Sequence, residues 1–146
     1  MYQTLIIIGN LGKDPETRFT PGGQPVTTLS VATNRRYHAM GGQPVKETTW
    51  FRITVWGKQS EACTQFLHKG SKVLVEGRLT PDPKTGSPRV WENNGKAAAS
   101  YEVTASTIRF LSGREDQEET IPEGEENDFS ADGNMTQNPE ISDIPF

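Results

Sequence analysis

The sequence predicts an all-β domain, a small barrel of five strands with one short helix, followed by a disordered acidic tail. Runs rich in Val, Ile and Thr alternate with Gly- and Pro-containing breaks, a pattern typical of short strands. Only residues 58–69 place apolar side chains at helical spacing. Residues 115–146 contain 11 acidic side chains and no Lys or Arg, which is typical of a segment outside the folded core.

The first half of the chain contains three predicted strands. The first covers residues 3–9 and stops at a Gly-Asn-Leu-Gly turn. A Pro-Gly-Gly turn at residues 21–23 precedes the second strand, residues 25–33. Two glycines at positions 41 and 42 interrupt the chain again before the third strand, residues 48–57. This third strand alternates strictly, as a strand with one buried face should.

The second half begins with the predicted helix, residues 58–69, which Gly70 ends. A short strand follows at residues 73–77, and residues 101–111 form the last strand. Between them lies a long excursion, residues 80–99, in which Asn94-Gly95 indicates a hairpin turn. Five main strands with a helix between the third and the fourth is the order of an OB-fold, a Greek-key barrel.

Charge divides the chain into two parts. Residues 1–114 contain all 15 Lys and Arg and 8 acidic residues, a net charge of +7, whereas residues 115–146 carry −11, which together give −4. A basic body is suited to a nucleic-acid partner, and the low apolar content and high charge of the tail predict disorder. We therefore expect a folded domain over residues 1–112 and a disordered tail over residues 113–146.

The third strand has the composition of a nucleic-acid-binding surface. With period two, one face would fill the core and the other would present Trp50, Arg52, Thr54 and Trp56. Tryptophans stack on bases while an arginine neutralises phosphate. At about 3.3 Å per residue, Trp50 and Trp56 would lie roughly 20 Å apart, a span of several nucleotides. The alternative is that one tryptophan faces a core or a subunit interface.

Other candidate residues lie in less regular segments. Tyr37 follows Arg35-Arg36 in a predicted loop that continues to Lys46, either a nucleic-acid clamp or an ordinary solvated loop. Trp91 lies near Arg89 in the long excursion, where it either stacks on a base or holds the loop together. Further basic side chains line a groove or are solvated surface charges: Lys58, Lys69, Lys72 and Arg78.

Several functional classes are disfavoured by the sequence. The longest apolar run, Leu5–Ile8, is far shorter than the roughly 18 residues of a membrane span, and Met1 leads directly into a strand without a signal peptide. Cys63 is the only cysteine, so neither a disulfide within the chain nor a cysteine-based metal site is expected. Residues 9–13 are not a phosphate-binding loop, because Asp14 follows Lys13. We expect an intracellular, non-enzymatic protein with no metal, no cofactor and no membrane contact.

Several segments together resemble the bacterial single-stranded DNA-binding protein family. They are residues 8–19 (Ile-Gly-Asn-Leu-Gly-Lys-Asp-Pro-Glu-Thr-Arg-Phe), 49–52 (Thr-Trp-Phe-Arg), 56–58 (Trp-Gly-Lys), 66–73 and 75–79. This resemblance covers about residues 2–111. The C-terminal Asp143-Ile144-Pro145-Phe146 independently resembles the acidic tip of that family.

The resemblance implies an OB-fold homotetramer that wraps single-stranded DNA with little sequence preference, in the bacterial cytoplasm and associated with the nucleoid. Trp50 matches a stacking tryptophan of the family, Trp56 stands where phenylalanine is common, and Tyr37 stands where tryptophan is common. Arg52 and Lys58 match basic positions near the DNA path.

The tail is implied to recruit replication, recombination and repair proteins through residues 140–146. Phe146 offers a ring and the terminal carboxylate to an apolar pocket with a basic rim, and Pro145 limits the entropy lost on binding. The same tail could fold back on the basic body and compete with DNA at low salt. Two other functions stay open: an OB-type RNA reader or primosome-type interaction module, and an enzyme on the same barrel. The enzyme is disfavoured because no Ser/His/Asp or Cys/His arrangement is evident in the sequence.

Overall fold

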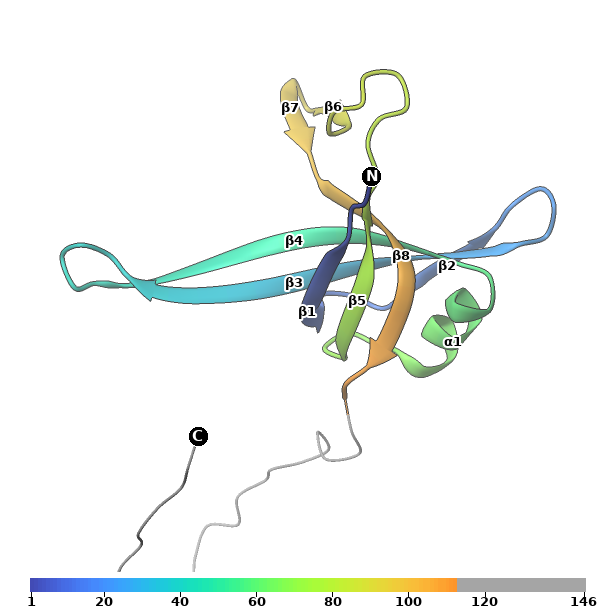
Figure 1. The fold of residues 1–146 in the computed structure, drawn as a ribbon, viewed down its shortest axis with the longest axis horizontal. Coiled ribbons are helices and arrows are strands. Elements are labelled where there is room, and N and C mark those ends of the chain that lie inside the picture. The colour runs from blue at the N-terminus through green and yellow to red at the C-terminus, as the bar shows by residue number, and fades with distance from the viewer. Residues whose placement is uncertain (113–146) are drawn as a thin grey trace, which may run out of the picture.

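The barrel is built from five long strands, as seen in a computed structural model that describes residues 1–112 (Figure 1). They are β1 (Leu5–Leu11), β3 (Pro25–His38), β4 (Pro44–Trp56), β5 (Lys72–Leu79) and β8 (Tyr101–Phe110). Helix α1 (Lys58–Phe66) connects β4 to β5. Three strands of four residues each complete the fold: β2 (Glu16–Phe19), β6 (Val90–Asn93) and β7 (Lys96–Ala99).

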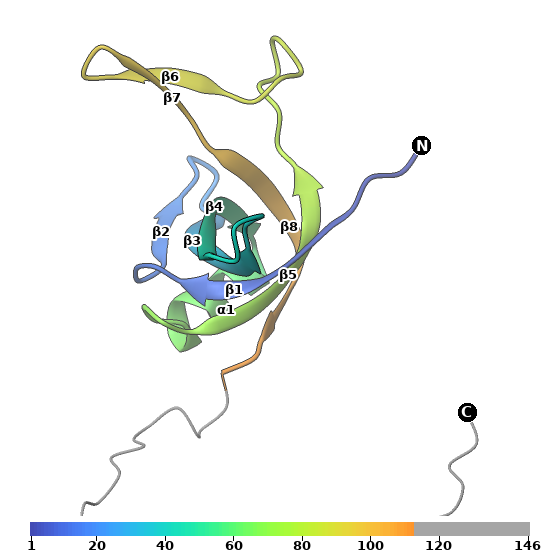
Figure 2. The same ribbon diagram turned by 90° about the vertical axis from the view of Figure 1, so that its left-hand side faces the viewer.

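The strand order closes the sheet into a barrel. Strands follow one another as β1-β5-β8-β4-β3-β2, and an additional pairing of β1 with β3 joins the two sides. β4 and β8 run parallel, and every other neighbouring pair in this sheet is antiparallel. Figure 2 views the β3–β4 hairpin end-on and shows β1, β5 and β8 curving past it. The predicted five-strand OB-fold with its helix between the third and fourth main strands is confirmed.

The core consists of the inward-facing residues of the five main strands and one side of α1. Buried residues include Leu29, Val31, Ile53, Val55, Val73, Val75 and Val103, all with less than 2% of their surface exposed. Cys63 of the helix is fully buried among them. Desolvation by burial raises the pKa of the Cys63 thiol to about 11, so this side chain stays protonated and acts as a small apolar residue.

Buried hydroxyl groups attach the helix and β2 to β3. The Thr27 hydroxyl lies 2.7 Å from the Ser60 hydroxyl of α1 and 2.7 Å from the Thr17 hydroxyl of β2. Thr64 of the helix donates to the Ser60 carbonyl at 3.1 Å, which keeps its hydroxyl in the same network. Because these polar groups satisfy one another, three elements pack closely without an unpaired buried donor.

The β3–β4 hairpin differs from the sequence prediction. Residues 34–47, expected to be mainly loop, continue both strands, and residues 39–43 form the turn between them. Tyr37 therefore lies in β3 and pairs with Val45, not in a loop. The resulting arm projects beyond the barrel (Figure 1). It leaves the core, so its side chains show no apolar alternation from which a strand could be predicted.

The remaining differences are at element ends and in short strands. β2 was not predicted, since all four of its residues are exposed and it has no apolar face. The helix ends at Phe66 instead of residue 69. Within the long excursion, the predicted turn is present: Asn94 and Gly95 have φ of 50° and 77° and connect β6 to β7.

Two further predictions concern membranes and the tail. No helix within residues 1–112 has the length and apolar character needed to cross a membrane. The predicted disordered tail, residues 113–146, and its tip, residues 140–146, lie outside the described residues.

Glycines make room where strands cross at close range. A Cβ atom on Gly9 of β1 would overlap the Ala32 carbonyl oxygen of β3, at the place where these two strands close the barrel. A Cβ atom on Gly77 of β5 would overlap the Thr104 carbonyl oxygen of β8, next to an irregularity in the pairing register. Backbone lies in both places, so no side-chain movement could relieve the overlap.

We expect Gly9→Ala and Gly77→Ala each to lower the free energy of unfolding by about 1–3 kcal/mol, the usual cost of overpacking. Gly41→Ala is the matched control, because nothing lies within 4 Å of its added Cβ atom and its φ is not positive. Urea denaturation of the three variants measures the effect. Equal midpoints for Gly9→Ala, Gly77→Ala and the control would contradict the close strand crossing.

Candidate nucleic-acid interface

The outer face of β4 carries the aromatic residues that the sequence places there. Ile53 and Val55 are buried, whereas Trp50 is 52% exposed and Trp56 is 45% exposed. Arg52, between the two tryptophans on the same face, is also exposed. Within one subunit, neither tryptophan belongs to the core, which removes one of the alternatives left open by the sequence.

Trp56 belongs to a row of three side chains that crosses three strands. In antiparallel sheets, directly paired residues point to the same face. Trp56 of β4 pairs with Val26 of β3, and Val26 pairs with Arg18 of β2. Arg18 thus adds a positive charge to the tryptophan face. Sequence reasoning missed it because β2 was not predicted, and its only signal was the position of Arg18 between two strand-forming residues.

Trp50 belongs to a second row, which continues around the barrel. Trp50 pairs with Ala32 of β3, Ala32 with Asn10 of β1, and Asn10 with Lys72 of β5. Lys72 lies three strands away from Trp50 along this row. At about 4.8 Å between neighbouring strands, this is about 14 Å measured along the sheet. Ala32 and Asn10 lie between them in this row, which ends at the positively charged Lys72.

Gly12 supports the Trp50 ring. A Cβ atom at this position would overlap ring atoms Cζ3 and Cη2 of Trp50, so the indole lies directly against the Gly12 backbone. The sequence indicated only a turn at residues 9–13 after the first strand. The structure adds that the second glycine of this turn leaves room for an aromatic side chain on a different strand.

A hollow of about 240 Å³ lies beside Trp50 and brings in the long excursion. Trp50, Arg52, Trp91 and Ser100 line it, together with Lys13 and Glu16 from the segment after β1. Trp91 is 40% exposed, so its ring is only partly covered. The β6–β7 hairpin thus places a third tryptophan near the outer face of β4, a position that the sequence left undetermined.

Two acidic residues, Glu16 and Glu102, lie near this face, and only Glu16 is in an ion pair. Lys13 Nζ donates to Glu16 Oε1 at 2.6 Å, the one ion pair within residues 1–112. The hydrogen bond and the charge of Lys13, with a smaller contribution from Arg52, lower the pKa of Glu16. Glu102 of β8 pairs in register with Arg52 but makes no ion pair with it. Arg18 and Arg52 therefore have no ion-pair partner among residues 1–112, although the charge of Arg52 acts on Glu16.

The projecting hairpin carries four of the predicted site residues. Arg36 and Lys46 are directly paired and share one face, and Arg35 and Tyr37 lie on the other face of the same ribbon. The Arg35 guanidinium carbon lies 5.0 Å from the centroid of the Tyr37 ring, within the range of a cation–π contact.

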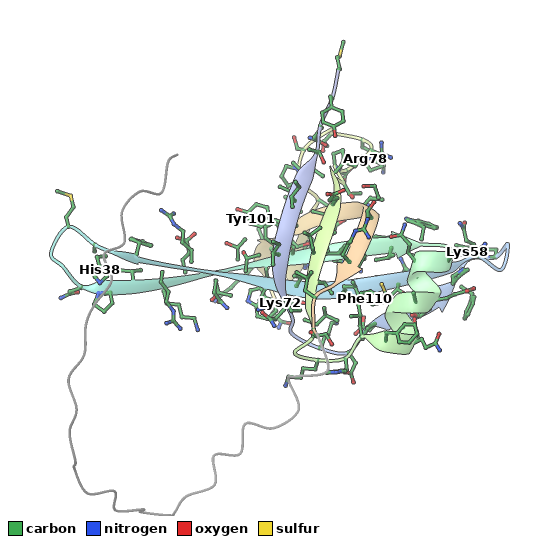
Figure 3. The ribbon with its side chains drawn as sticks, turned by 60° about the horizontal axis from the view of Figure 1, so that its bottom comes forward. His38, Lys58, Lys72, Arg78, Tyr101 and Phe110 are labelled. Carbon is green, nitrogen blue, oxygen red and sulfur yellow. The ribbon has the colours of Figure 1, made fainter. Side chains whose placement is uncertain are left out.

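The other predicted basic residues surround the barrel and do not form one cluster. Figure 3 shows Lys58 at the helix, with Arg78 and Lys72 near opposite ends of the barrel. Arg78 pairs with Thr104, which pairs with Thr54 of β4, so it extends the outer face by two strands. Arg89 immediately precedes β6, on the segment that carries Trp91. In residues 1–112, no group of three or more His, Cys, Asp or Glu is arranged to hold a metal ion.

Curated proteins of bacterial origin match most of this chain. The single-stranded DNA-binding protein of Helicobacter hepaticus is 32% identical over 131 residues, which are 89% of this chain and 69% of that protein. The protein of the same name from Neisseria meningitidis serogroup A is 35% identical over 118 residues, which are 81% of this chain and 64% of that protein. The chain thus spans about two thirds of the length of these curated relatives.

Solved structures share the fold. A deletion mutant of the single-stranded DNA binding protein from Thermus aquaticus has a TM-score of 0.60 at 32% identity, over 76% of this chain and 51% of that one. A Plasmodium falciparum SSB complex with ssDNA has a TM-score of 0.62 at 25% identity, over 77% of this chain and 96% of that one. Residues 2–111 match the profile of the Single-strand binding protein family. The chain belongs to the single-strand binding protein family.

Proposed function

We propose that this protein binds single-stranded DNA with little sequence preference and protects it. The observation that carries this proposal is the outer face of β4, where two half-exposed tryptophans flank an exposed arginine. The Plasmodium falciparum relative was solved with ssDNA bound, which supports the same ligand for this barrel. Membership of the single-strand binding protein family supports it further.

The chemistry of the face explains the preference for single strands. A base can stack on Trp50 or Trp56 only after it has left the stack of a duplex, so paired DNA is a poor ligand. Every base has a π-face, and stacking therefore tolerates any sequence. Arg52 and Arg18 are placed to neutralise backbone phosphates between the stacked bases, and Trp91 offers a third ring beside the Trp50 hollow.

The proposed DNA-binding set extends from this face over the barrel and the hairpin arm. It comprises Trp50, Trp56, Trp91, Tyr37, Arg52, Lys58, Arg35, Arg36, Lys46, Lys72, Arg78 and Arg89, and we include Arg18 because it shares a row with Trp56. Through counterion release, affinity for single strands should fall as salt rises. In this proposal the protein is a non-catalytic scaffold in the bacterial cytoplasm, associated with the nucleoid.

We also propose that the protein assembles as a homotetramer. β1 pairs with β5 along Leu5–Asn10 but with β3 only at Asn10 and Leu11, so one edge of its first half has no partner strand among residues 1–112. On the same strand, Ile6 is 60% exposed and Ile8 is 56% exposed. A free strand edge next to exposed isoleucines is suited to pairing with another copy and is an aggregation hazard without one.

A third proposal concerns the tail. Asp143 is followed by the apolar residues Ile144, Pro145 and Phe146, a combination suited to an apolar pocket with a basic rim. We propose that this tip, residues 140–146, recruits replication, recombination and repair proteins to the bound DNA. The separation of charge along the chain supports the proposal, because it keeps the basic DNA-binding surface and the acidic recruiting segment apart.

We expect Trp50→Ala and Trp56→Ala each to weaken binding of oligo(dT) by about 1–3 kcal/mol, the contribution of one stacked base. Fluorescence anisotropy of a labelled oligonucleotide measures the affinity, and a duplex of the same length is the competitor. Phe66→Ala is the control, since it removes an exposed aromatic ring from α1, outside the proposed set. Wild-type affinity in both tryptophan variants, with the oligomer intact, would defeat the stacking assignment.

The double variant Ile6→Glu/Ile8→Glu should dissociate the tetramer into smaller species, because it places charges on the exposed face of β1 next to its unpaired edge. Analytical ultracentrifugation measures the mass. Val90→Glu, at a 64% exposed position on the β6–β7 hairpin, should leave the mass unchanged. A tetramer that survives the β1 substitutions would place the interface elsewhere.

Deletion of Phe146 should leave the affinity for oligo(dT) unchanged or slightly higher and should abolish the recovery of partner proteins. The tip supplies the apolar anchor for partners but no contact to DNA. Immobilised full-length and truncated proteins, loaded with the same single strand, are compared for partner recovery by mass spectrometry. Equal recovery by both would contradict the assignment of the tip.

A further inference from the structure

The hairpin arm contains a like-charge pair that the fold itself does not explain. Arg36 of β3 and Lys46 of β4 are directly paired, and both are exposed. Directly opposed residues in an antiparallel pair have Cβ atoms about 4.5–5.5 Å apart, and like charges at such positions destabilise the sheet. The arm projects from the barrel, so no core packing offsets the repulsion (Figure 1).

No acidic residue of the arm compensates this pair. Glu47 is the only acid in residues 34–48, and it pairs with Arg35 on the other face of the ribbon. Within the described part of the chain, the single ion pair joins Lys13 to Glu16. On the face of Arg36 and Lys46, the next row inward is neutral and satisfies itself, since Thr48 Oγ1 donates to Asn34 Oδ1 at 2.8 Å.

The two faces of the arm therefore differ in chemistry. One presents the Tyr37 ring with the Arg35 guanidinium already stacked against it. The other presents Arg36 and Lys46, with His38 in the next row outward. Figure 3 shows His38 near the free end of the arm. Among the described residues, the second face thus offers two adjacent cations without a cation–π contact and without an acid opposite them.

We propose that Arg36 and Lys46 form a clamp for one backbone phosphate of the bound strand. The planar guanidinium of Arg36 donates two parallel hydrogen bonds to phosphate oxygens, while Lys46 adds a point charge from the opposite strand. An anion between the two cations replaces their repulsion with two attractive interactions. This inference rests on the proposed DNA binding and adds that the arm holds the phosphate backbone by this cross-strand pair.

The clamp predicts opposite effects on binding and on stability. In Lys46→Gln, the plot of the log of the DNA-binding constant against the log of the salt concentration should become less steep. The slope should shrink in magnitude by about 0.7 for each arm that the strand engages, which is the value for one phosphate contact on a single strand. The denaturation midpoint of the free protein should stay equal or rise, because the repulsion is removed. Lys46→Glu should pair with Arg36, raise the midpoint further and weaken oligo(dT) binding more than Lys46→Gln does.

Lys84→Gln is the matched control. Lys84 is an exposed lysine between β5 and β6 whose backbone amide donates to Asp82 Oδ1, so its substitution removes the same charge away from the arm. Its salt slope should equal that of the wild type. Affinities are measured with the full-length tetramer and oligo(dT) over a series of NaCl concentrations, with the mass checked by ultracentrifugation.

Each other outcome would overturn the clamp. An unchanged salt slope in Lys46→Gln would exclude a phosphate at this pair, and a lowered midpoint would assign Lys46 a structural role. An equal loss of slope in Lys84→Gln would show that the pair is not a special site. Loss of the tetramer with an unchanged slope would assign the pair to contacts between copies. If the wild type itself binds no single strand, the proposed function fails instead.

Discussion

The pairing of β3 with β4 is the interaction on which the rest of the structure depends. All 13 residues of β4 are paired with β3, from Trp56 opposite Val26 to Pro44 opposite His38. Near the barrel this register points Ile53 and Val55 into the core and Trp50, Arg52 and Trp56 outward. Beyond the barrel the same register sets Arg36 against Lys46. A shift by one residue would reverse every one of these placements, because side chains alternate with a period of two.

Three glycines connect the stability of the barrel to the geometry of its outer face. Gly9 and Gly77 allow backbones to approach at the crossings of β1 with β3 and of β5 with β8. Gly12, only three residues after Gly9, leaves the space that the Trp50 ring occupies. One short segment at the end of β1, residues 9–12, thus both closes the barrel and positions an aromatic side chain of the candidate interface. The hydroxyl network of Thr27, Ser60 and Thr17 holds β2 against β3 and the helix, and thereby positions Arg18 of β2.

Local charge, and not the total charge of −4, describes the surface that faces a ligand. On the outer face of the barrel, Glu16 is engaged by Lys13, and Arg18 and Arg52 remain without an ion-pair partner among the described residues. On the arm, two cations oppose each other directly. These unpaired positive charges do not stabilise the isolated fold, but they attract a polyanion that binds across them. The electrostatic pattern and the exposed tryptophans therefore support the same class of ligand.

The sequence alone determined the features that depend on local periodicity. The alternation of residues 49–57, the single helix, the Asn94-Gly95 turn and the order of the five main strands were all predictable, because a buried face or a left-handed turn leaves a signature within a few residues. Only the tertiary structure decided the features that depend on pairing between distant segments. Polar strands such as β2 and the hairpin arm have no apolar contrast to reveal them. Strand register decides which residues lie beside Trp56, Trp50 and Lys46. The path of the long excursion decides that Trp91 lines the hollow beside Trp50. No local sequence pattern encodes either feature.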